Sequence, residues 1–358
     1  MTGSEQLPTT PTPAMMRAVI CRSGGETAYS DAPFEYAASH PEPALGGLHA
    51  AFPELPCPEA STVLIRVGFS SMNPADRGTD DHRTPKVMGS DVCGTVIAAG
   101  AGCTRLKVGD EVFGDIGANA AFAVEGETVT TKQLGAWGEV AEALETQLAH
   151  KPSNLSQLEA GVLPKVALTS YKALSWHCGS VDWASAPTVL IIGCSSGCGT
   201  CAIQIAKALG AGAVHATCSG RNVEYCRGLG AQTVVDYTQV SGRLVVVVVV
   251  LLLLLLLLCF HSSHGCARLP AQESWAEVLG PDSLDIVYDC IGEPDAGDGA
   301  MATLRSGGAF VSIRGVASDP ANARDDVSQV RQPSLRVRSK AGSTYCRSPQ
   351  FEAMTEVT

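Results

Sequence analysis

Positive charge is scarce in this sequence. Its 358 residues include 25 lysines and arginines against 36 aspartates and glutamates, which gives a formal net charge of −11. Proteins that bind nucleic acid through bulk electrostatics carry a basic patch or stripe, and we find no such stripe along this chain. The sequence therefore argues against a nucleic-acid partner.

The sequence also lacks a secretory signal and a compact disulfide framework. Its 14 cysteines are scattered, which is typical of reduced and mostly buried thiols in an intracellular protein. Residues 1–14 are rich in threonine and proline and contain Glu5 but no arginine. This composition favours a disordered leader over a mitochondrial transit peptide, so we expect a cytoplasmic protein.

The length of the chain predicts two domains, because 358 residues are too many for one comfortable hydrophobic core. In the first part, the segments 62–67, 91–97 and 107–114 are short apolar runs separated by glycine, proline and aspartate. Short strands at this spacing predict a small barrel-like β domain. We assign this domain to residues 15–150.

Strand and helix patterns alternate in residues 151–315. The run Thr188–Ile192 is continuously apolar, as expected of a parallel strand buried on both faces. A helix to Leu209 follows it, with apolar residues along one face. Further strands are expected at 213–217, 233–236, 284–288 and 309–313, and further helices at 221–229, 274–279 and 299–304. This alternation predicts an α/β fold with a doubly wound parallel sheet of the Rossmann type.

One segment, residues 240–272, interrupts the alternation. It contains an unbroken apolar run, mostly valine and then leucine, over residues 244–260, close to the shortest length for a membrane helix. A membrane crossing here would separate strands that must pair in one sheet. Homopolymeric valine and leucine also lack the varied shapes that specify one packing. We therefore interpret 240–272 as a low-complexity insertion and an aggregation hazard, with a membrane span as the less favoured alternative.

A glycine-rich turn follows the apolar strand and opens the helix. It reads Gly193-Cys194-Ser195-Ser196-Gly197-Cys198-Gly199. The glycines allow the backbone to approach a pyrophosphate, and the helix N-terminus offers N–H groups and the positive end of its dipole. Ser195 and Ser196 add hydroxyl donors. Because a strand precedes the turn and a helix follows it, the pattern predicts a dinucleotide site; a tight turn without a ligand is the alternative.

The end of the second strand indicates which dinucleotide is bound. A site that prefers NAD usually has an acidic residue there to accept from the ribose 2′-hydroxyl. This sequence reads Thr217-Cys218-Ser219-Gly220-Arg221-Asn222, with no acid. The Ser219 hydroxyl can hydrogen-bond a 2′-phosphate, and the Arg221 guanidinium can pair with it. The segment therefore favours NADPH, the alternative being that Arg221 is a solvated charge at the start of the next helix.

Seven segments carry a family resemblance. They are Asn73–Asp76, Gly89–Gly94, Leu163–Tyr171, the glycine-rich turn, Ile203–Lys207, Leu229–Ala231 and Val235–Tyr237. Together they resemble the medium-chain dehydrogenase/reductase superfamily, and within it the quinone oxidoreductase and enone reductase branch, over residues 16–315 apart from the insertion. The resemblance implies a GroES-like barrel beside the nucleotide domain. It also implies NADPH contacts from Ser195, Gly197, Cys198, Ser219, Arg221 and Tyr237, with Asn73 and Thr169 facing the nicotinamide and substrate.

The resemblance also allows a test for zinc. The alcohol dehydrogenase branch has a cysteine where this chain has Asn73, and Gly-His-Glu where it has Gly89-Ser90-Asp91. Thiolate and imidazole hold zinc, whereas a neutral amide and a hydroxyl do not replace them. The four-cysteine loop of that branch is also missing, since no cysteine lies between Cys103 and Cys178. We therefore expect no metal, and hydride delivery to an electrophilic acceptor such as a quinone or an α,β-unsaturated carbonyl.

Two departures from the family leave alternatives open. The stretch between Asp76 and Gly89 is short and lacks the tyrosine that some members place near the substrate, so the proton donor is water, Tyr171 or no group that the sequence identifies. Residues 316–358 are polar without a clear closing strand, and we interpret them as a truncated return segment that leaves the barrel incomplete. An enoyl-thioester reductase and a non-catalytic NADPH-binding protein remain alternatives. The family analogy also implies a homodimer and allows a mitochondrial location.

Overall fold

The computed structural model describes most of the two predicted domains. The described residues are 14–21, 34–45, 61–77, 86–117, 122–124, 127–129, 135–239, 275–293, 295–313, 319 and 322–331. They fall into two compact units, one ending at Lys165 and the other beginning at Val166.

The first unit is built from antiparallel strands. Its main sheet has the order β10-β6-β5-β3-β9, and its strands are β3 (Thr62–Phe69), β5 (Asp91–Ala99), β6 (Glu111–Asp115), β9 (Val140–Leu144) and β10 (Leu148–His150). A smaller sheet, β2-β1-β4, comprises β1 (Met15–Cys21), β2 (Phe34–Pro41) and β4 (Lys86–Val87). The strands β7 (Phe122–Val124) and β8 (Glu127–Val129) pair only with each other, as a two-stranded sheet, among the described residues. The expected β domain is confirmed.

Apolar side chains of the main sheet form the core of this unit. Val63, Ile65, Val92 and Val112 are completely buried within it, and the helix α3 (Gln157–Val162) contacts β3 and β5. A short helix, α2 (Pro74–Arg77), follows β3. The unit also contains the 3₁₀ turn η2 (Glu145–Gln147). Residues 151–165 are grouped with this unit, and α3, which lies within them, contacts β3, β5 and β6.

The second unit contains a six-stranded parallel sheet of order β13-β12-β11-β14-β15-β16. Its strands are β11 (Thr188–Ile192), β12 (Ala213–Cys218), β13 (Thr233–Asp236), β14 (Leu284–Asp289), β15 (Leu304–Ser312) and β16 (Ser328–Arg331). Val189–Ile192 of the central strand β11 are completely buried, as the apolar run predicts. The doubly wound α/β sheet is confirmed.

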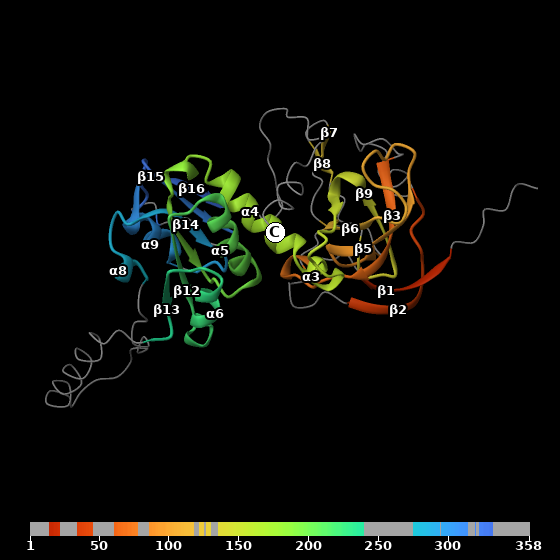
Figure 1. The fold of residues 1–358 in the computed structure, drawn as a ribbon, viewed down its shortest axis with the longest axis horizontal. Helices are drawn as coiled ribbons and strands as arrows, with labels where there is room; N and C mark the ends of the chain where they lie inside the picture. Colours follow the sequence, from red (N-terminus) through yellow and green to blue (C-terminus); the bar gives the residue numbers. More distant parts are fainter. Residues whose placement is uncertain are drawn as a thin grey trace, which may run out of the picture. The chain divides into compact units, whose positions relative to one another are not determined.

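Helices cover both faces of this sheet. The helices α5 (Gly197–Leu209) and α6 (Val223–Gly228) lie on one face, and α8 (Trp275–Leu279) and α9 (Ala296–Thr303) lie on the other (Figure 1). Before β11 the chain forms α4 (Pro164–Lys172), a π-helical turn η3 (Ala173–His177) and a 3₁₀ turn η4 (Trp183–Ser185); η5 (Gly220–Asn222) precedes α6. Gly210 ends α5 with φ +104°, a conformation that favours glycine.

One element differs from the sequence analysis. We interpreted residues 316–358 as a return segment without a clear strand to close the barrel; β16, which lies in this segment and was not predicted, pairs with β15 as the sixth strand of the parallel sheet. It is the last strand in the order, and such an edge strand does not need the continuous apolar run by which buried strands are recognised. The part of the return segment beyond Arg331 lies outside the described residues.

Residues 1–13 of the leader 1–14 and the whole insertion 240–272 also lie outside the described residues, so both assignments stay predictions. In the part of the chain that the structure describes, no helix is long and apolar enough to cross a membrane.

Candidate functional site

The predicted nucleotide-binding residues gather at one edge of the second sheet. The glycine-rich turn follows β11, Ser219 and Arg221 follow β12, and Tyr237 follows β13. These three strands are neighbours and parallel, so their carboxyl ends meet at the same edge. Crevices at the carboxyl ends of parallel strands are where open α/β sheets bind ligands.

Backbone geometry explains the glycines of the turn. Gly193 has φ +76°, which a side chain would strain. A Cβ atom at Gly199 would lie 2.4 Å from the carbonyl oxygen of Gly193, and one at Gly197 would lie 2.9 Å from Cγ1 of Val166. The turn is therefore too tight for side chains at 193 and 199, and its backbone is left accessible at the exposed Gly197.

Hydrogen bonds fix the start of α5. Ser196 is the N-cap, and its Oγ accepts a hydrogen bond of 3.1 Å from the backbone N–H of Gly199. The hydroxyl of the buried Ser170 on α4 donates to the carbonyl oxygen of Cys198 at 2.8 Å. Ser195 is exposed beside this helix start. The N-terminus of a 13-residue helix is thus held in place with a hydroxyl at its entrance, the arrangement that suits an anion.

Ser219 and Arg221 lie on the short turn after β12. The Ser219 hydroxyl oxygen accepts a hydrogen bond of 3.3 Å from Nδ2 of Asn222, and the Arg221 side chain is exposed. Tyr237 is also exposed. A positive and two hydroxyl-bearing side chains therefore follow the ends of the neighbouring strands β12 and β13, where the 2′-phosphate is expected from the sequence.

The structure adds a carboxylate that the sequence analysis missed. A Cβ atom at Gly220 would lie 2.4 Å from Oδ2 of Asp236, so this acid at the end of β13 lies beside the turn that carries Ser219. Hydrogen bonds from Thr238 and Gln239 lower the pKa of Asp236. Its charge opposes a phosphate, and the parallel pairing of β12 and β13 is the signal that could have placed it there.

In the first unit, Asn73 belongs to a buried polar network. Its Nδ2 donates to Oδ2 of Asp91 at 2.8 Å, and Ser71 Oγ donates to the same oxygen at 2.5 Å. Oδ2 of Asp76 accepts from the Asn73 backbone N–H at 2.7 Å, and Oδ1 of Asp76 accepts from the Ser90 hydroxyl at 2.6 Å. The side chains of Asn73 and Ser90 are thus both bound to carboxylates.

Asp91 is the electrostatic centre of this network. It is completely buried, and burial, with the nearby charge of Asp115, raises its pKa to about 6 although Ser71, Asn73 and Lys165 act in the opposite direction. Its Oδ1 accepts from the backbone N–H of Lys165 at 2.7 Å, and the ammonium group of Lys165 lies 2.8 Å from Oδ2 of Asp115. Asp91 and Lys165 both lie in segments that carry the family resemblance, but this arrangement was not predicted from the sequence.

Thr169 lies on α4 and is half-buried. It belongs to the second unit, whereas Asn73 belongs to the first. Their joint role at the nicotinamide and substrate stays a prediction.

Two family descriptions match this chain. Residues 59–153 match the alcohol dehydrogenase GroES-like domain, and residues 197–358 match the zinc-binding dehydrogenase family. The chain belongs to the medium-chain dehydrogenase/reductase superfamily. The recognition made from the sequence motifs is therefore confirmed, including the likeness to the quinone oxidoreductase and alkenal/one reductase branch.

Relatives in this superfamily include plant reductases. The 2-methylene-furan-3-one reductase of Solanum lycopersicum is 31% identical over 267 residues, which cover 72% of this chain and 56% of that protein. The NADPH-dependent alkenal/one oxidoreductase, chloroplastic, of Arabidopsis thaliana is 29% identical over 266 residues, with the same two coverages. The chain thus spans little more than half the length of these curated relatives.

A solved structure supports the fold. The crystal structure of an alcohol dehydrogenase superfamily protein from Novosphingobium aromaticivorans aligns with a TM-score of 0.59 and 26% identity, over 88% of this chain and 78% of that one. The GroES-like antiparallel domain and the Rossmann-type sheet agree with the two family descriptions that match the chain.

Proposed function

We propose that this medium-chain reductase is an NADPH-dependent enzyme that reduces quinones or α,β-unsaturated carbonyls without zinc. The observation that carries the proposal is the sheet edge where the glycine-rich turn, Ser219, Arg221 and Tyr237 meet. The printed names of the tomato and Arabidopsis relatives, a furanone reductase and an NADPH-dependent alkenal/one oxidoreductase, agree with this chemistry.

Each part of the edge has a role in this proposal. The turn formed by Gly193, Ser195, Ser196, Gly197, Cys198 and Gly199 holds the pyrophosphate, because it offers close backbone approach and a capped helix N-terminus. Ser219, Arg221 and Tyr237 hold the 2′-phosphate of the adenosine ribose. When bound, NADPH supplies the hydride. Asn73 and Thr169 orient the acceptor.

The absence of zinc from the proposal rests on the chemistry of two side chains. Where the zinc-dependent branch has cysteine and histidine ligands, this chain has Asn73 and Ser90, and both donate hydrogen bonds to neighbouring carboxylates. An amide nitrogen that donates a hydrogen bond has no lone pair for a metal ion. Such a site suits an acceptor that is electrophilic without a Lewis acid.

Cofactor choice is tested first, by calorimetric titration of the full chain with NADPH and NADH. We expect tighter binding of NADPH. Arg221→Ala should weaken NADPH binding by about ten- to a hundred-fold, the loss of one or two charge-assisted hydrogen bonds, and leave NADH binding unchanged. Arg227→Ala is the matched control, since Arg227 is an exposed arginine on α6 paired with Glu224. Equal or tighter binding of NADH by the unmodified chain would refute the proposal.

Activity is tested by NADPH oxidation with a panel of quinones, enones and a crotonyl thioester. We expect turnover with a quinone or an enone, at a rate unchanged by prior dialysis against a chelator. Turnover of the thioester alone would instead identify an enoyl-thioester reductase. Tight NADPH binding without turnover of any acceptor would identify a non-catalytic binding protein.

A further inference from the structure

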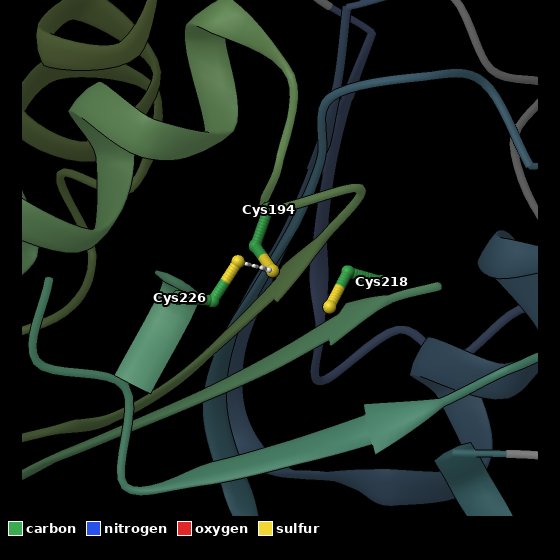
Figure 2. Close-up of side chains that lie close together, drawn as sticks. All are labelled: Cys194, Cys218 and Cys226. Carbon is green, nitrogen blue, oxygen red and sulfur yellow. Dashed lines mark hydrogen bonds between the residues drawn. The ribbon is translucent and has the colours of Figure 1, made fainter. Parts of the chain in front are cut away.

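Three buried thiols converge beside the glycine-rich turn. Cys194 belongs to the turn after β11, Cys218 is the last residue of β12, and Cys226 lies on α6 (Figure 2). None of the three is more than 1% exposed. Their Sγ atoms all lie within 4.8 Å of one another, and the Sγ atoms of Cys194 and Cys226 are 3.0 Å apart. Within the described residues, no other group of three or more cysteine, histidine or carboxylate side chains has its ligand atoms this close together.

The spacing of the sulfurs suits one shared central atom. Three sulfurs bound to one ion at about 2.3 Å, the usual zinc–thiolate distance, lie about 4 Å apart. The present spread, from 3.0 Å to at most 4.8 Å, brackets this value. The three cysteines come from three different elements, so small movements of α6 and the turn can close the site.

Charge decides which central atom fits. Burial is the largest cause that raises the pKa of the Cys218 thiol, to about 11, and the negative charge of Asp236 raises it further. Burial likewise raises the pKa of Cys194. Three thiolates with a monovalent or divalent cation would leave a net negative charge in this buried place, which is unfavourable without a counter-charge. A trivalent element cancels all three charges.

We propose that Cys194, Cys218 and Cys226 form a binding site for a trivalent, thiol-seeking element, of which arsenic(III) is the probe. Arsenous acid reacts with the three thiols to form three As–S bonds, while three As–O and three S–H bonds break. Each hydroxide leaves as water with one thiol proton. Arsenic stays trivalent, no oxidant is consumed, and the product is neutral.

Binding at this site is coupled to the glycine-rich turn. The backbone N–H of Cys194 donates to the carbonyl oxygen of Thr217 at 3.0 Å, and the N–H of Gly193 donates to the Thr217 hydroxyl at 3.2 Å. An atom that bridges the three sulfurs ties the turn, β12 and α6 together. We therefore expect NADPH affinity to change when the site is filled, a consequence that rests on the proposed function.

The test measures arsenic retained by the reduced full chain. The chain is incubated with arsenite, passed through a desalting column, and analysed for arsenic per chain by elemental and native mass spectrometry. Cys226→Ala, and separately Cys218→Ala, should lower the affinity of the tightest site by at least about ten-fold. Cys178→Ala is the matched control, because Cys178 is a completely buried thiol of the same unit outside the cluster.

The outcomes separate this proposal from the proposed function. Equal arsenic retention by all variants, or none by the unmodified chain, overturns the site. So does tighter binding of Zn²⁺ or Cu⁺ than arsenite at these thiols, or their oxidation to a disulfide in place of arsenite binding. Circular dichroism identifies a variant that fails to fold, and the other cysteine variant then decides. Arsenic binding without any NADPH binding refutes only the proposed function.

Discussion

At the residue scale, Asp91 illustrates how a hydrogen-bonded carboxyl group can still be poorly ionised. It accepts hydrogen bonds from Ser71, Asn73 and the Lys165 backbone, and each of these favours the charged form. Complete burial and the neighbouring Asp115 outweigh them and raise its pKa to about 6. Asp91 therefore holds a proton in the folded chain at pH values where it has lost one in the unfolded chain.

This difference predicts how stability depends on pH. The pKa of Asp91 is higher in the folded chain than its ordinary value of 3.8. Its stabilising contribution to the unfolding free energy is therefore complete below about pH 4 and is lost as the pH rises to about 6. A rise from 3.8 to about 6 corresponds to about 3 kcal/mol. Urea unfolding between pH 4 and 7 should show this loss in the unmodified chain and a flatter profile in Asp91→Asn. Asp325→Asn, which removes an exposed carboxyl, should keep the original slope; a similar slope in all three would contradict the assignment.

The site residues that sequence could predict are those whose role is local. Gly193 and Ser196 follow from a strand, a turn and a helix that are contiguous in the chain. The carboxylate of Asp236 beside Gly220 and the ion pair of Lys165 with Asp115 join residues from separate elements. Their positions depend on strand pairing and packing, which a single sequence does not specify.

At the element scale, short strands of the parallel sheet were predicted best. The observed bounds of β11 and β13 equal the expected ones. The expected helix at 299–304 begins earlier, at Ala296, and β15 begins at Leu304 instead of residue 309. Leu304 pairs with Leu284 of β14, the register then shifts to Ile286 and Ala309, and three of the positions between Leu304 and Ala309 are exposed. Tertiary pairing, rather than local periodicity, sets such boundaries.

The glycine-rich turn gives a prediction at this scale. Gly199→Ala would place a Cβ atom 2.4 Å from the Gly193 carbonyl oxygen and 2.5 Å from Cα of Cys194. Both are backbone atoms, so the turn itself must move, and we expect a loss of about 1–3 kcal/mol in unfolding free energy together with weaker NADPH binding. Gly228→Ala, in α6, meets nothing within 4 Å and should instead stabilise the chain by about 0.5–1 kcal/mol. Thermal and urea unfolding of both variants measures the contrast, and equal effects would show that the turn is not this tight.

At the scale of the whole molecule, the convergence of the three cysteines of the proposed thiol site could not be predicted from the composition of the chain. Fourteen scattered cysteines indicate reduced thiols, and Cys194, Cys218 and Cys226 are buried free thiols. Their convergence follows only once β11 and β12 are known to be parallel neighbours, with α6 packed against the next strand. A cysteine after one strand and another at the end of its neighbour is the signal that could have suggested it.

Deletion of the valine- and leucine-rich run 244–260 tests whether the fold needs the full length of the connection between β13 and α8. The described chain stops after Gln239, beyond β13, and resumes at Trp275 in α8, and both elements belong to the nucleotide-binding unit. Halving a flexible connection changes the free energy of closing it by only about 0.6 kcal/mol. Deleting residues 244–260 should therefore leave unfolding free energy and NADPH affinity nearly unchanged.

The same deletion should raise the fraction of monodisperse protein, because runs of valine and leucine without charges are aggregation-prone. Size-exclusion chromatography with light scattering, on the full and shortened chains without detergent, measures this fraction. If the full chain instead requires detergent and binds phospholipid vesicles while the shortened chain does neither, the run is a membrane-binding segment. If the shortened chain loses its parallel sheet by circular dichroism, the run is part of the fold, because β13 and β14 could then not reach their places beside β12 and β11 without it.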